Sequence, residues 1–171
     1  TDEYYILLIL SCIIATVGLM QNSTAVIIGA MIVAPLMGPI LGFSAGTMWG
    51  SGKVLLESIS TLIKGCFIVL VISSLFAWLF PYFEMNEQIL SRTVPGLGDI
   101  LIAVASGFVG AYAYVNNRIS TSIPGVAIAV ALMPPLCTVG IGTGLQAWAL
   151  AAGAATLFLI NLIGISFAAI V

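Results

Sequence analysis

The sequence predicts an all-α integral membrane protein with six transmembrane helices, arranged as two three-helix repeats of inverted topology. Three observations support this prediction: the composition, six long apolar runs and an internal repeat. Of the 171 residues, 61% are hydrophobic and 6% are charged, against roughly 25% charged residues in a soluble domain. With a mean hydropathy of +1.25, the chain has too little polar surface to cover a core in water, which excludes a soluble globular protein.

The six apolar runs approach or exceed the length of about 20 residues that one membrane crossing requires. Polar joints separate them, among them a long loop over residues 81–98. The predicted spans are, in order, residues 4–20, 25–49, 59–80, 100–115, 123–143 and 145–171. We therefore expect a single membrane domain over residues 1–171, with one repeat over 1–80 and a second over 99–171.

Shifting the chain by 96 positions superimposes its two halves. A Met-x-Pro motif recurs at Met37–Pro39 and Met133–Pro135, and a Thr-Leu pair recurs at Thr61 and Thr156 with an offset of 95. Because each unit holds an odd number of crossings, the second unit must start from the opposite membrane face. The repeat thus predicts a pseudo-two-fold axis in the membrane plane. The alternative is a chance similarity between low-complexity hydrophobic segments.

Two prolines lie close together near the middle of the second and of the fifth predicted span. Proline has no backbone N–H and clashes with the preceding turn, so the pairs Pro35/Pro39 and Pro134/Pro135 predict that both spans are broken. Unpaired backbone groups cannot face lipid, and they are expected to line a wet cavity or to be buried in protein. Symmetric broken helices indicate a substrate or ion site; a packing kink filled by a neighbouring helix is the alternative.

Candidate binding residues surround these breaks. Asn161 places an amide near the middle of the last span, where it needs a partner in another helix or in a bound solute. The full set of candidate binding residues is Pro35, Met37, Gly38, Pro39, Met133, Pro134, Pro135, Thr138 and Asn161. Two polar clusters precede the second and fifth spans, where we expect helix capping or an entrance. They comprise Asn22, Ser23, Thr24, Asn117, Arg118, Ser120 and Thr121.

Several classes of function are not supported by the residues present. The chain has no His, and its three cysteines stand alone in apolar runs, so no metal or cofactor site is expected. A net charge of −2 without a basic cluster argues against nucleic-acid binding. The segment Gly96–Asp99 has the GxGD form of intramembrane aspartyl proteases, but the second aspartate, Asp2, is expected on the opposite membrane face. We therefore expect no enzyme.

The distribution of basic residues predicts the orientation. Lys53, Lys64 and Arg118 lie around the second-to-third and fourth-to-fifth connections, whereas Arg92 is the one basic residue between the third and fourth spans. Under the positive-inside rule both termini are then cytoplasmic. Glycines at every fourth position from 38 to 50 indicate close helix packing within or between protomers, and a homo-oligomer surrounded by membrane lipid is expected.

Three segments of the chain resemble those of a known family. They are VIIGAMIVAPLMGP over residues 26–39, AVALMPPL over residues 129–136 and TLFLINL over residues 156–162. The sequence resembles domain-of-unknown-function family 389, the uncharacterised hydrophobic domain, over nearly its whole length. The resemblance implies an integral protein of the prokaryotic inner membrane, and no established activity, substrate or catalytic residue. Because members often carry a soluble domain before the membrane part, a chain that opens with Thr is expected to be a fragment.

The leading hypothesis is a transporter or channel-like protein that moves a small solute or ion past the two breaks. The alternative is a non-transporting membrane module that anchors, oligomerises or signals for a preceding cytoplasmic domain. The poverty of intramembrane charge and the dense glycines favour the alternative. A dry, packed core around the breaks would support the module, and a continuous water-lined cavity would support transport.

Overall fold

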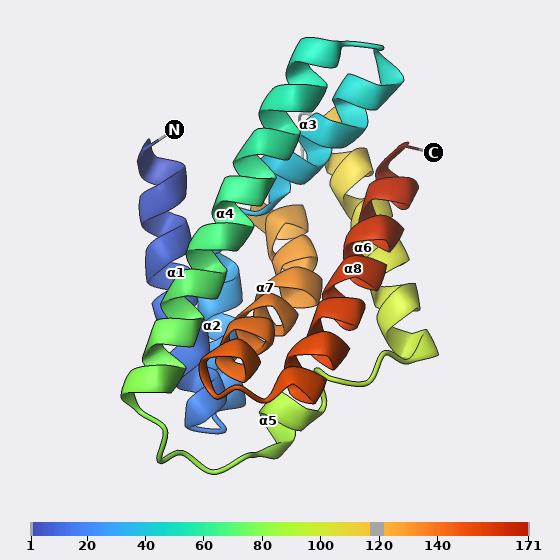
Figure 1. Ribbon diagram of the computed structural model, residues 1–171. Coiled ribbons are helices and arrows are strands. Elements are labelled where there is room, and N and C mark those ends of the chain that lie inside the picture. The colour runs from blue at the N-terminus through green and yellow to red at the C-terminus, as the bar shows by residue number, and fades with distance from the viewer. Residues whose placement is uncertain (1, 117–121, 171) are drawn as a thin grey trace.

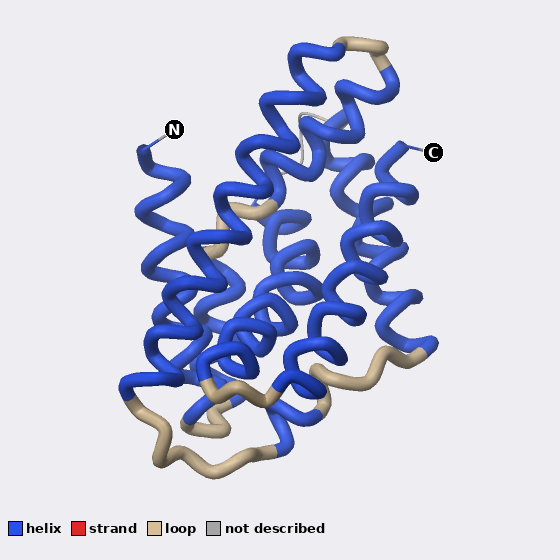
Figure 2. Tube along the Cα trace, in the orientation of Figure 1, coloured by secondary structure: helices blue, strands red, loops and turns tan. Residues whose placement is uncertain are grey.

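In the computed structural model, which describes residues 2–116 and 122–170, the chain is a bundle of helices (Figures 1 and 2). The described residues form eight helices and no strand. The helices are α1 (Asp2–Met20), α2 (Thr24–Val33), α3 (Met37–Met48), α4 (Gly52–Leu79), α5 (Glu87–Leu90), α6 (Leu97–Val115), α7 (Ser122–Gly144) and α8 (Trp148–Ile170). Five helices are long and apolar enough to cross a membrane, and the bent α2–α3 pair makes a sixth span if counted as one.

The predicted spans correspond to α1, the α2–α3 pair, α4, α6, α7 and α8. Two of the six begin at least three residues earlier than predicted. α4 begins at Gly52 because Ser51 has an extended backbone. The helix therefore includes Lys53, which precedes the apolar stretch. α6 begins at Leu97, because the Gly96 N–H donates to Asp99 Oδ2 at 2.8 Å and caps the helix start. The loop predicted over residues 81–98 also holds the short helix α5.

α2 and α3 form a span that bends by 51°. Pro35 cannot donate to the carbonyl of Met31 and disfavours a helical Ala34, whose backbone is extended, so α2 ends at Val33. Pro39 lies in the first turn of α3, where backbone N–H groups have no intrahelical acceptor, so it ends no helix. Of the predicted pair, Pro35 alone accounts for the bend.

The prediction that the fifth span is broken is wrong: α7 is one helix through both Pro134 and Pro135. Proline at 135 deprives the Ala131 carbonyl of its intrahelical donor, but Asn161 Nδ2 donates to that oxygen at 2.8 Å. The Thr138 hydroxyl also donates to the Pro134 carbonyl, at 2.9 Å. These bonds, and neighbours on every side, keep the backbone of α7 helical.

α7 is the central helix of the bundle. In its membrane-crossing stretch 72% of the residues are buried, and α1, α2, α4, α6 and α8 all pack against it. α4 approaches it closely, because Gly140 and Gly144 leave room for Ser73 and Ser74. These two glycines thus serve helix packing within the chain.

Two turns, 96 positions apart, have the same structure. In the turn over residues 46–51 the last N–H donates to the first carbonyl at 3.0 Å, and in the turn over residues 142–147 at 2.8 Å. The fifth residue of each has a positive φ, 63° at Gly50 and 57° at Gln146, which ends α3 and α7 in the same way. The two turns lie at opposite ends of the bundle, whereas the N- and C-termini lie at the same end (Figure 1).

Candidate functional site

Two pockets with polar linings lie beside Pro39 and Pro135. The first, of about 280 Å³, lies among α1, α3 and α4 and is lined by Tyr4, Gly38, Pro39, Val54, Glu57, Ser58 and Thr61. The second, of about 60 Å³, lies among the α5–α6 loop, α6, α7 and α8 and is lined by Arg92, Asp99, Ile102, Val130, Ala131, Pro135, Leu157 and Asn161. We call them the first-half pocket and the second-half pocket.

The first-half pocket is rich in hydroxyl groups. The Tyr4 hydroxyl is buried against Gly65 and has no hydrogen-bond partner in the described part of the chain. The Thr61 hydroxyl donates to the Glu57 carbonyl at 2.8 Å, and the buried Ser58 adds a third hydroxyl. The Glu57 side chain is exposed near the start of α4. These groups can hydrogen-bond a small polar solute or a hydrated ion.

The second-half pocket combines charged groups from the α5–α6 connection with an amide from α8. Arg92 Nε and Asn161 Oδ1 are both buried, and neither has a hydrogen-bond partner among the described residues. Burial lowers the pKa of the Arg92 guanidinium, and the nearby Asp99 carboxylate offsets part of this shift. The guanidinium still stays cationic at neutral pH. The pocket thus contains an unsatisfied donor and an unsatisfied acceptor, which a bound polar group would satisfy.

A packed apolar layer lies between the levels of the two pockets. Met37, which begins α3 beside the first-half pocket, packs against Gly125 on α7. From Gly125 to Ala131 at the second-half pocket is roughly 9 Å along the helix. Over this distance Ile128 and Ala129 are fully buried in the main hydrophobic core. These two side chains therefore belong to the packed apolar core.

The structure brings four of the predicted binding residues into these pockets. Gly38 and Pro39 line the first-half pocket, and Pro135 and Asn161 line the second-half pocket. The other predicted residues line neither pocket. Met133, Pro134 and Thr138 are buried within α7, and Pro35 and Met37 are half-buried at the α2–α3 break.

The polar residues before α2 organise the start of that helix. Ser23 is its N-cap, and the Ser23 Oγ accepts a hydrogen bond from the Val26 N–H at 3.4 Å. Asn22 has a positive φ of 54°. The Thr24 hydroxyl accepts from Gln88 Nε2 at 3.0 Å, which connects α2 to α5. Of the second cluster, Asn117, Arg118, Ser120 and Thr121 lie outside the described residues.

Sequence reasoning missed the groups that make both pockets polar. They are Tyr4, Glu57, Ser58, Thr61, Arg92 and Asp99. The charged ones flank the apolar runs, a position typical of loops and membrane interfaces. A signal for one of them is present: Arg92 is the single basic residue between the third and fourth spans, close in sequence to Asp99.

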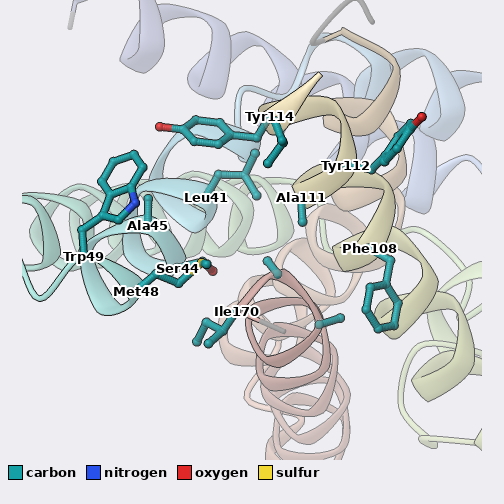
Figure 3. A pocket seen from close by; sticks show the side chains of 13 residues that line it. Leu41, Ser44, Ala45, Met48, Trp49, Phe108, Ala111, Tyr112, Tyr114 and Ile170 are labelled. Atoms are coloured by element: carbon teal, nitrogen blue, oxygen red, sulfur yellow. The ribbon is translucent and has the colours of Figure 1, made fainter. Parts of the chain in front are cut away.

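A third pocket, of about 710 Å³, is larger and apolar. It lies among α3, α6 and α8 and is lined by aromatic and aliphatic side chains, among them Trp49, Phe108 and Tyr112 (Figure 3). The buried hydroxyl in its wall, on Ser44, already donates to the Ile40 and Ser166 carbonyls at 3.2 and 3.5 Å. Such a lining suits a lipid chain or an apolar helix better than a polar solute.

Comparison with known proteins places the chain in a family. The sequence profile of "Domain of unknown function (DUF389)" matches residues 31–167. The uncharacterised protein MJ0678 of Methanocaldococcus jannaschii is 38% identical over 171 residues, which is 100% of this chain and 53% of that protein, so the chain spans about half the length of this relative. No solved structure matches the chain. The resemblance carried by the proline-containing segments is confirmed, and the chain belongs to the DUF389 family of unknown function.

Proposed function

We propose that this protein is a membrane transporter or channel-like protein for a small polar solute or ion. The observation that carries this proposal is the pair of polar pockets beside Pro39 and Pro135, two residues 96 positions apart. α1 and α4 begin at the end of the bundle where both termini lie, and α6 begins at the opposite end (Figure 1). One pocket is therefore nearer to each end, as a pathway with alternating access requires.

Two inverted three-helix repeats would relate the pockets to each other. The identical turns at opposite ends of the bundle support this relation. So do the helix contacts beside them: a Cβ on Gly46 would lie 2.8 Å from the Leu55 nitrogen, and one on Gly142 would lie 2.8 Å from the Ala151 nitrogen. The halves bend differently because residue 131, which corresponds to Pro35, is alanine.

Passage of a solute would require the packed layer between the pockets to part. α7 is the element best suited to move, since it runs through this layer and reaches the second-half pocket at Pro135. Its Val130 and Ala131 carbonyls lack intrahelical donors because residues 134 and 135 are prolines, and helices bend most easily at such points. Bending there would open the layer without unfolding the helix.

Uptake into liposomes containing the purified protein tests the proposal, with labelled Na⁺, K⁺, halides, small organic anions and amino acids as solutes. Gly38→Leu should fill the first-half pocket and abolish uptake, and it should fold because a Cβ at Gly38 meets nothing within 4 Å. Gly29 is equally open but lines neither pocket, so Gly29→Leu is the matched control. Undiminished uptake in Gly38→Leu, or no uptake of any solute by the native protein, would contradict transport.

A non-transporting membrane module is the second candidate, favoured by the packed apolar layer between the pockets and by the large apolar pocket. Such a module would anchor, oligomerise or signal for further domains of a longer protein. If a homo-oligomer forms through the apolar pocket, replacing Trp49 in the wall of that pocket with Ala should lower the molar mass measured by light scattering. A monomeric native protein in lipid nanodiscs would count against it.

We further propose an inner-membrane location in a prokaryotic cell, cytoplasmic termini, lipid as partner, and no enzymatic activity, cofactor or nucleic acid. Lys53 supports the orientation, since α4 begins at the end of the bundle that carries both termini. Asp2 and Asp99 begin α1 and α6 at opposite ends of the bundle, too far apart to share a proton as an aspartyl-protease dyad does.

A further inference from the structure

The Arg92 side chain is a partly buried cation without a partner. Its guanidinium makes no hydrogen bond or ion pair within the described part of the chain, and its Nε is fully shielded. Asp99 is near enough to interact with it electrostatically, but its Oδ2 accepts from the Gly96 N–H. Shielded charges in proteins are normally hydrogen-bonded to a counter-charge. The buried Nε–H of Arg92 therefore lacks an acceptor among the described residues.

In the same pocket, the side chain of Asn161 has a buried oxygen that needs a hydrogen-bond donor. Its side chain is only 3% exposed, and its amide group donates to the Ala131 carbonyl at 2.8 Å. This bond fixes the side-chain orientation, because a flipped amide would set two oxygens against each other. Oδ1 is left buried without a donor, which costs free energy unless a bound group donates to it.

The other polar groups of the pocket define the charge of a suitable ligand. Asp99 adds a carboxylate, and the Val130 carbonyl has no intrahelical donor because residue 134 is proline. A metal cation would be repelled by the guanidinium, and a simple anion would meet a carboxylate and an amide oxygen. A ligand that carries both charges satisfies the two sides at once.

We infer that the second-half pocket binds a small zwitterion, an α-amino acid of the size of glycine or alanine. Its carboxylate accepts from Arg92, and its ammonium donates to Asn161 Oδ1 and Asp99. The size limit follows from the small volume of the pocket, about 60 Å³. As a statement about the transported solute, this inference rests on the proposed function, but binding itself is measurable without transport.

Equilibrium dialysis of the detergent-purified protein against labelled glycine tests the inference. We expect saturable binding that alanine displaces, and that leucine, acetate and methylammonium do not displace at the same concentration. Arg92→Gln and Asn161→Leu should each weaken binding about tenfold or more, because each removes a hydrogen bond to a charged ligand group. Lys53→Gln, which removes an exposed cation outside the pocket, should bind glycine as the native protein does.

A second pair of variants tests the pocket without changing the buried amide of Asn161. Ile102 lines the pocket and is 51% exposed, so Ile102→Trp can fill the space without disturbing the core, and it should abolish binding. Its neighbour Leu101 is 71% exposed and lies outside the pocket, so Leu101→Trp is the matched control. Glycine binding that survives Ile102→Trp and Arg92→Gln, displacement by acetate as effective as by alanine, or no saturable binding would overturn the inference. Glycine binding without uptake would instead contradict the proposed transport and leave the binding site standing.

Discussion

At the scale of single residues, the contact between Asn161 and Ala131 explains how α7 stays helical past two prolines. Removing the amide with Asn161→Leu leaves the Ala131 carbonyl without a donor, and we expect a loss of about 1–2 kcal/mol in the free energy of unfolding. In a Pro135→Ala background the new backbone N–H can reach that carbonyl. The same Asn161→Leu change should then cost less than half as much.

Reversible unfolding in mixed micelles, followed by circular dichroism, measures both free energies. The double-mutant cycle isolates the coupling between residues 135 and 161. Gln146→Leu, an exposed amide in the turn after α7, serves as a control that should change stability by no more than about 0.5 kcal/mol. Equal costs in the two backgrounds would mean that Asn161 does not replace the bond that Pro135 removes.

At the scale of elements, the two prolines of the second span have different effects. Pro35→Ala restores an N–H for the Met31 carbonyl, so the 51° bend should decrease. Spin labels at the exposed residues Ala25 and Trp49 should move apart by about 3 Å if the bend is lost, judged from the helix rise. Pro39→Ala should leave the distance unchanged, because Pro39 lies in the first turn of α3. A longer distance in Pro39→Ala but not in Pro35→Ala would show that Pro39, rather than Pro35, causes the bend.

The glycines that lie against the backbone of a neighbouring helix should tolerate substitution least. A Cβ at Gly46 or Gly142 would lie 2.8 Å from a backbone nitrogen of the next helix, and backbone cannot move aside as a side chain does. We expect Gly46→Ala and Gly142→Ala each to lower the free energy of unfolding by about 1–3 kcal/mol. Gly29→Ala, where nothing lies within 4 Å, should not destabilise the protein. A destabilising Gly29→Ala, or neutral changes at the other two, would show that close approach is not what selects glycine here.

The sequence predicts the elements of this protein far better than it predicts the site. Apolar length and polar joints are local properties, and they predicted all six spans to within a few residues at most ends. Whether a proline pair breaks a helix is not local. In α7 it depends on a donor from α8, Asn161, whereas α2 ends at Val33, before Pro35. Local reasoning therefore found the break at Pro35 and wrongly predicted one at Pro134 and Pro135.

The pocket residues were harder to predict for a related reason. Tyr4 and Arg92 lie outside the two proline pairs and outside the repeated motifs. They reach the pockets because α1 packs against α4 and because the α5–α6 connection folds over α7 and α8. Such contacts between distant segments depend on the tertiary fold, which the hydrophobic pattern does not encode residue by residue.

At the scale of the whole molecule, the proposed inverted repeat makes a prediction about sidedness. Gly52 and Trp148 are both exposed, each begins a helix after one of the two identical turns, and they lie 96 positions apart at opposite ends of the bundle (Figure 1). Cysteines introduced at these two positions should therefore react with a membrane-impermeant maleimide from opposite sides. With cytoplasmic termini, Gly52→Cys should react in inside-out vesicles and Trp148→Cys in intact spheroplasts.

The native cysteines provide the background for this measurement. Cys12 and Cys137 are buried and Cys66 is half-buried, so the native protein should be labelled little from either side. Reaction of both introduced cysteines from the same side would refute the inverted repeat and, with it, the pairing of the two pockets across the membrane. Reaction from opposite sides with the order reversed would keep the repeat and the pockets but move the termini, and therefore the first-half pocket, to the outer face.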